Sequence, residues 1–228
     1  MCWNATISLN TFIFSVATLG FIAYNNAHTK YKIPEFMASA SKGGSPWLYA
    51  FILSIVGMQL VEYFLWNNLR NPDANRFWSI IGSLLVMCQP LTISLLITDK
   101  AIQPMVTMAY AAFMAVLIAF KYPGHLDKYK TVAGKDGLSW KWHLDNPLEY
   151  IYYAVYWIVV IYSSTFIPRY LAFAIFGILA ISTWRYGAGD SFTWGSKWCW
   201  GMNVLAFYYL YRIMIGMPFK EMIGTCKN

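Results

Sequence analysis

The chain has 228 residues, of which 58% are hydrophobic and only 12% are charged. Soluble domains average about 45–50% apolar and about 25% charged residues, so this composition excludes an ordinary soluble domain. The formal net charge is +7, but the lysines are scattered over several loops, which argues against a nucleic-acid groove and favours membrane lipids as the partner.

Apolar blocks separated by short polar stretches run along the whole chain. They suit membrane-spanning helices, which need about 20 residues each, and they lack the alternating pattern of barrel strands. The predicted fold class is therefore all-α, a polytopic transmembrane bundle that forms one domain over residues 1–228. We predict seven spans, at 5–25, 47–69, 77–98, 104–121, 148–168, 169–185 and 197–216.

The first predicted span begins without the basic residues that open a cleavable signal peptide, so we expect it to stay attached. Lys30 and Lys32 follow it, which favours an N-terminus outside the cytosol. Over the whole chain, however, the positive charges divide almost evenly between the two faces. The connector at 26–46 is rich in Gly, Pro and polar residues, and we predict an irregular segment there.

The second predicted span carries an ionisable residue, Glu62. Gln59, Glu62 and Trp66 are spaced at i, i+3 and i+7, so they share one helical face, which must look into the bundle. A carboxylate in a span is costly and needs a partner or a water-filled cavity. Two interpretations stay open: a hydrogen-bonded side chain that ties helices together, or a carboxylate that binds a proton or a ligand.

The third predicted span contains a proline about halfway through the bilayer. Pro90 cannot donate to the carbonyl of Val86, so a kink beside Gln89 is expected. Broken helices line solute sites in many transporters, although single proline kinks also occur in spans without a function. Gln89 is therefore a candidate binding residue, and the neighbouring Cys88 is expected to be a small packing residue.

The loop at 122–147 has a strand-like pattern. Residues alternate on either side of Gly134-Lys135-Asp136-Gly137, which predicts a small β-hairpin. Trp140 and Trp142 would share one face of this hairpin, and we expect them to dip into the lipid headgroup layer.

The last predicted spans are rich in aromatic residues. Pro168 and Arg169 divide the fifth span from the sixth, because one span of that combined length would be too long for a bilayer. Arg212, near the end of the seventh, is expected to reach the headgroups. The aromatic side chains either form a cage for a cation or a flat ligand, or serve as packing and belt. They are Tyr150, Tyr152, Tyr153, Tyr156, Trp157, Trp194, Trp198 and Trp200.

Alternating topology places polar residues of different spans at similar depths on the N-terminal side of the bundle. Such groups are costly in lipid, so we predict a polar cluster that binds an ion or a small solute. Its members are Asn10, Gln59, Glu62, Arg185 and Asn203. Cys2 and Cys199 fall near the same face, where a disulfide is geometrically allowed if that face is oxidising.

Several known chemistries of membrane proteins lack their residues here. A retinal protein needs a lysine within the last span, and Lys197 lies only at its edge. Gly187-Ala188-Gly189-Asp190 resembles the motif of intramembrane aspartyl proteases, but the second aspartate in a preceding span is absent. His28, His125 and His143 lack metal-ligand spacing. We expect no catalytic residue, no metal and no cofactor.

Three short motifs carry a resemblance. The opening Met1-Cys2-Trp3, the face formed by Gln59, Glu62 and Trp66, and the pair Trp198-Cys199 resemble a family of small uncharacterised multi-pass membrane proteins of giant DNA viruses and algae. The resemblance implies a viral or protist source and no mechanism, because that family has no established activity. It makes Gln59, Glu62 and Trp66 the residues to test first.

Two functional hypotheses follow. In the first, the bundle is a small transporter or channel for protons, cations or a small polar solute, built on Glu62. In the second, it is a non-catalytic structural or scaffolding membrane protein, for example in the internal membrane of a virus. The near absence of soluble mass favours the first, and the few ionisable residues favour the second. Homo-oligomerisation is left open, because no Gly-x-x-x-Gly stripe decides it.

Overall fold

The structure is a computed structural model, and it describes most of the chain. The described residues are 4–37, 45–121, 129–134, 137–140, 147–165, 167, 170, 173–178, 181 and 194–225, with the backbone alone described at 121, 147–150, 194–202, 224 and 225.

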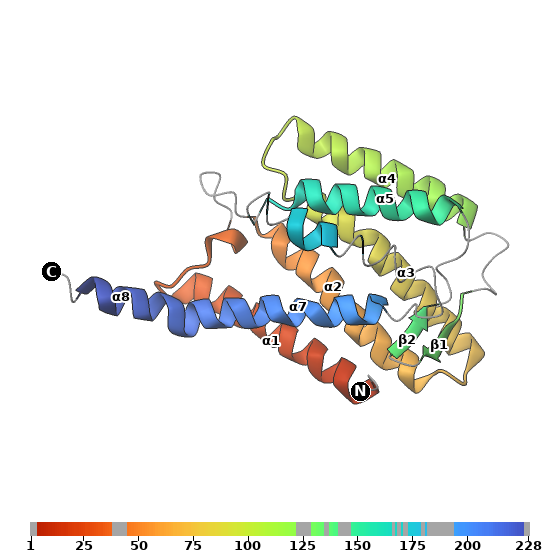
Figure 1. Ribbon diagram of the computed structural model, residues 1–228, viewed down its shortest axis with the longest axis horizontal. Helices are drawn as coiled ribbons and strands as arrows, with labels where there is room; N and C mark the ends of the chain where they lie inside the picture. Colours follow the sequence, from red (N-terminus) through yellow and green to blue (C-terminus); the bar gives the residue numbers. More distant parts are fainter. Residues whose placement is uncertain are drawn as a thin grey trace.

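Most of the described residues are helical, as the apolar blocks predict (Figure 1). The helices are α1 (Ala5–His28), α2 (Trp47–Asn67), α3 (Pro72–Ser94), α4 (Ile102–Lys121), α5 (Pro147–Ser163), α7 (Trp194–Tyr211) and α8 (Met217–Thr225), with a short 3-10 helix η1 (Pro34–Phe36) and a π-helical segment η3 (Arg212–Gly216) that joins α7 to α8.

Four helices of the described chain are long and apolar enough to cross a membrane. They are α1, α2, α3 and, within α4, the segment Ile102–Phe120, while α5 contributes a shorter apolar stretch at Ile151–Ser163. The chain is therefore compatible with a membrane protein. The predicted sixth span falls largely outside the described residues, although residues 173–178 are helical.

The start of α3 differs from the predicted 77. Its cap is Asn71, whose side chain accepts a hydrogen bond from the backbone N–H of Ala74 at 3.2 Å, and Pro72 follows as the first helical residue. A capping Asn and a Pro at the first position both favour a helix start. The helix therefore begins in polar sequence, before the apolar block that marked the span.

The first four long helices alternate in direction. Ser8 near the start of α1 contacts Glu62 near the end of α2. Between α2 and α3, the rings of Phe64 and Trp78 stack at 4.1 Å, and a Cβ on Gly57 would lie 3.1 Å from Leu85 Cδ2. Between α3 and α4, the Tyr110 hydroxyl donates to the Met87 carbonyl at 2.9 Å and Ser94 meets Thr107 at 2.9 Å.

The later helices run parallel to earlier ones. α5 is parallel to α3, because Tyr156 meets Gln89 within both helices and Thr165 meets Leu96 just beyond both. α7 is parallel to α1 and lies beside it (Figure 1). The residue numbers of the contacting partners increase together, from Ser15 with Asn203 to Lys30 with Glu221. Thus α1, α3, α5 and α7 share one direction.

The predicted β-hairpin is confirmed. Strand β1 (Thr131–Gly134) pairs antiparallel with β2 (Gly137–Trp140), with Gly134 opposite Gly137. Gly137 has a φ of 151°, which a residue without a Cβ adopts readily. The expected headgroup contact of Trp140 is wrong, because this side chain is only 2% exposed. Trp142 lies outside the described residues.

The hairpin is held inside one end of the bundle by α3 and α7 (Figure 1). The side-chain amide of Asn75 donates to the Thr131 carbonyl and accepts from the Thr131 N–H, both at 2.9 Å. The Ser79 and Thr131 hydroxyls are 2.8 Å apart. Asn75 therefore acts as a strand-like partner for β1, and polar contacts between distant residues hold the hairpin against α3.

The exposure of side chains tests two predictions, one about Cys88 in α3 and one about the aromatic residues of α5. Cys88 is exposed on the outside of α3, so its prediction as a packing residue is wrong. Tyr152, Tyr156 and Trp157 are buried in the core, with ring centroids 5.1 Å apart for the last two. These aromatic side chains of α5 therefore serve as packing.

The described part of the connector after α1 is irregular apart from η1, as predicted, and hydrogen bonds tie it to the end of α1. Asn26 accepts from the Ile33 N–H at 2.7 Å, and Ile33 and Phe36 are buried. Glu35 in η1 forms an ion pair with Arg212 at the start of η3. Arg212 is thus half-buried and paired with an acidic residue, and its expected contact with the headgroups stays a prediction.

Candidate functional site

The inner face of α1 is a row of polar side chains. They recur at heptad spacing and are buried where α1 packs on α2 and α7. A repeat of seven keeps one side of a helix facing its neighbours. Over this face the helix rises about 25 Å, close to the thickness of a hydrocarbon layer. The polar members of the row are Ser8, Thr11, Ser15, Thr18 and Asn25.

Glu62 meets this row near the start of α1. The carboxylate is 2% exposed, and the Ser8 hydroxyl donates to its Oε2 atom at 3.5 Å. Among the side chains that the structure describes, Glu62 is the one Asp, Glu, Lys, Arg or His that is buried. Its predicted inward orientation is confirmed, because the side chain is buried and contacts Ser8 of α1.

A second polar pair lies further along the same row. The Ser15 hydroxyl donates to Asn203 Oδ1 of α7 at 2.7 Å, and both side chains are buried. From Ser8 to Ser15 the helix rises about 10 Å. Two hydrogen-bonded pairs, one to α2 and one to α7, are therefore joined by a single face of α1.

Gln59 lies between these two pairs. It is one turn before Glu62 in α2, and the antiparallel packing puts it at the level of Thr11 in α1, one turn after Ser8. Its side chain is 1% exposed, and within the described part of the chain its amide nitrogen has no hydrogen-bond partner. Buried donors almost always have a partner, often a bound water or ligand.

Trp66 continues this face of α2 by one more turn. Its indole N–H is buried, and it too has no hydrogen-bond partner among the described residues. Gln59 and Trp66 thus flank the carboxylate of Glu62 with N–H donors. The arrangement therefore puts one N–H donor about a turn before the carboxylate and another about a turn after it.

The other predicted site residues divide into three groups. Asn10 is exposed on the outer side of α1, so its place in the cluster is wrong. Gln89 lies in a separate contact, where its amide donates to the Ser54 carbonyl at 3.3 Å and accepts from the Tyr156 hydroxyl at 2.5 Å. Arg185, Cys2 and the side chain of Cys199 lie outside what the structure describes.

The hydroxyl residues of α1 are the members of the site that the sequence reasoning missed. Ser and Thr carry no charge and are common in membrane helices, so they do not mark a site by composition. Their heptad spacing from Ser8 to Thr18 was the available signal.

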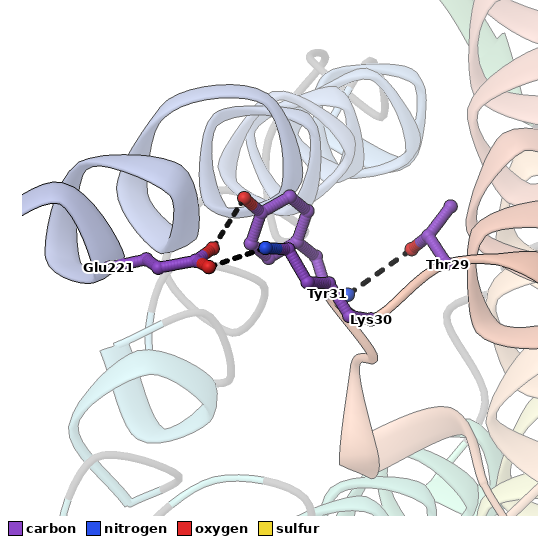
Figure 2. A network of polar contacts seen from close by, with 4 residues as sticks. All are labelled: Thr29, Lys30, Tyr31 and Glu221. Carbon is purple, nitrogen blue, oxygen red and sulfur yellow. Dashed lines mark hydrogen bonds and ion pairs between the residues drawn. The ribbon is translucent and has the colours of Figure 1, made fainter. Parts of the chain in front are cut away.

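A polar network joins the C-terminal helix to the segment after α1 (Figure 2). Glu221 of α8 pairs with Lys30 and accepts a hydrogen bond from the Tyr31 hydroxyl at 2.7 Å. The Tyr31 N–H donates to the Thr29 hydroxyl at 3.2 Å. The hydrogen bonds from Lys30 and Tyr31 lower the pKa of Glu221, and the bond to Glu221 raises the pKa of Lys30.

We expect the docking of α8 to depend on pH at both extremes. The depressed pKa of Glu221 keeps the contact present above the ordinary carboxyl range and lost as the pH falls through the lowered value. The raised pKa of Lys30 keeps it until the pH rises through that value. Spin labels at positions 27 and 223 should separate in acid, and a Lys30→Gln variant with an unchanged acid response would contradict this.

Among the described side chains, no three His, Cys, Asp or Glu residues converge as metal ligands. Comparison with protein-family models, curated proteins and solved structures gives no match to this chain. Function is therefore inferred from the residues themselves.

Proposed function

We propose that this protein is a multi-pass membrane protein that binds a proton, a cation or a small polar solute between α1, α2 and α7, as a small transporter or channel does. One observation carries the proposal: Glu62 is 2% exposed and hydrogen-bonded to Ser8 where two helices apolar enough to cross a membrane meet. An ionisable group at such a place is costly and most often marks an ion or solute pathway.

The helix directions support a seven-span arrangement. α5 and α7 run the same way, so a seven-span arrangement needs one further crossing between Ser163 and Trp194. Those intervening 30 residues are enough for one further span. Five crossings between α1 and α7 agree with their parallel packing.

A second candidate function is a structural or scaffolding membrane protein. The heptad of Ser and Thr on α1 favours it, because small polar side chains let helices pack closely and hydrogen-bond to one another. In this case the contact between Ser8 and Glu62 joins two helices and binds nothing.

Infrared difference spectroscopy separates the two candidates. The reconstituted protein is exposed to a pH step, to sodium or potassium, and to small polar solutes, and a carboxyl band is expected to change with at least one of them. Glu62→Gln should remove this band, while Glu221→Gln on the surface of α8 should keep it. A spectrum with no band that depends on Glu62 would favour the structural candidate.

A further inference from the structure

The polar row of α1 is interrupted at one position. Its heptad positions fall on Ser8, Thr11, Ser15, Thr18, Ile22 and Asn25. Five of these residues are polar, and the exception is Ile22, which is 1% exposed and therefore points inward like the others.

The part of the row before Ile22 has the spacing of a hydrogen-bonded chain. Successive side chains are separated by about 4.5 or 6 Å along the helix axis. A water molecule that bonds to two oxygen atoms joins groups about 5.6 Å apart, so single waters bridge these intervals. Gln59, whose buried amide nitrogen has no described partner, offers a place for such a water at the level of Thr11.

The interval across Ile22 is different. Thr18 and Asn25 are separated by about 10 Å along the axis, too far for one water. The antiparallel packing puts Leu48 of α2, which is fully buried, at the level of Ile22. Beyond it, Asn25 is engaged with the Tyr31 carbonyl at 2.5 Å. An apolar layer thus separates the hydroxyl row from the polar end of α1.

We propose that the guest of the Glu62 site is a proton and that Ile22 is the hydrophobic barrier that limits the rate of its passage along α1. This inference rests on the proposed function and names its substrate class. A proton passes along hydroxyls and waters by exchange of O–H bonds, with no net change in bonding or charge, and needs no wide pore. The row from Ser8 to Thr18 is 9% exposed or less at every polar member, which favours a bare proton over a hydrated ion.

A serine at position 22 completes the row and tests the barrier directly. Proteoliposomes with Ile22→Ser are expected to dissipate a pH gradient about ten times faster than those with the original chain, since apolar constrictions block conduction by excluding water. Ile13→Ser is the matched control, because Ile13 lies on the same helix but is 54% exposed. Ile22→Thr keeps the branched shape and serves if the serine variant folds poorly.

The possible outcomes test the barrier, the identity of the ion and the proposed function separately. If folded Ile22→Ser and Ile22→Thr hold a pH gradient as well as the Ile13→Ser control, the barrier is wrong. If they leak sodium or potassium as fast as protons, the assignment of the proton is wrong. A proton leak without any infrared band that depends on Glu62 would support the barrier and remove the proposed function. An infrared band that depends on Glu62, without a proton leak in the Ile22 variants, would support the proposed function and remove the barrier.

Discussion

Replacing Asn75 with alanine is expected to lower the free energy of unfolding by about 2–4 kcal/mol, since each buried polar group left without a partner costs about 1–3 kcal/mol. Asn75 is 2% exposed and satisfies both backbone groups of Thr131 at 2.9 Å. Alanine supplies neither hydrogen bond, and the hairpin is too enclosed for bulk water to replace them. The hairpin should loosen along with the end of the bundle that it fills.

Asn10→Ala is the matched control for this experiment. Asn10 sits on the outer side of α1, where the same substitution should change stability by about 0.5 kcal/mol or less. Unfolding of both variants in mixed detergent micelles, followed by circular dichroism, measures the difference. Equal stabilities for the two variants would contradict the role given to Asn75.

Much of the helical framework was predictable because lipid imposes a simple rule on length and polarity. Apolar blocks placed α1, α2 and α4 within a few residues of their observed bounds. The start of α3 was missed because Asn71 and Pro72 begin the helix before its apolar part. The β-hairpin was predictable from the turn between Gly134 and Gly137.

The position of the hairpin was not predictable from local sequence. Tryptophan is a residue type that often anchors a protein at the lipid headgroups, yet Trp140 is buried. Its environment depends on the contact of Asn75 with Thr131, which are 56 residues apart. Local patterns predict which segment forms a strand, but they do not say which distant side chain will hold it.

Local sequence also predicted only part of the candidate site. The spacing of Gln59 and Glu62 correctly predicted an inward face of α2, because periodicity fixes which residues share a face. Depth in the membrane also suggested Asn10, but depth does not give direction, and the buried face of α1 runs through Ser8 and Thr11 instead. The partnership of Ser15 with Asn203 required the packing order of α1 and α7.

Flux through proteoliposomes that contain the original chain or Glu62→Gln tests the central claim most directly. Glutamine keeps the size of the side chain and an oxygen for the Ser8 hydroxyl, but it removes the charge and the titratable proton. Flux should therefore fall by a factor of about ten or more, since a loss of about 1.4 kcal/mol in binding is already tenfold. Glu221→Gln is the control, because Glu221 lies on the exposed surface of α8.

We predict a proton flux under a pH gradient or a voltage that the original chain and Glu221→Gln share and that folded Glu62→Gln loses. Equal flux in the original chain and in folded Glu62→Gln, or no flux of protons, cations or small polar solutes in any of the three, would contradict it.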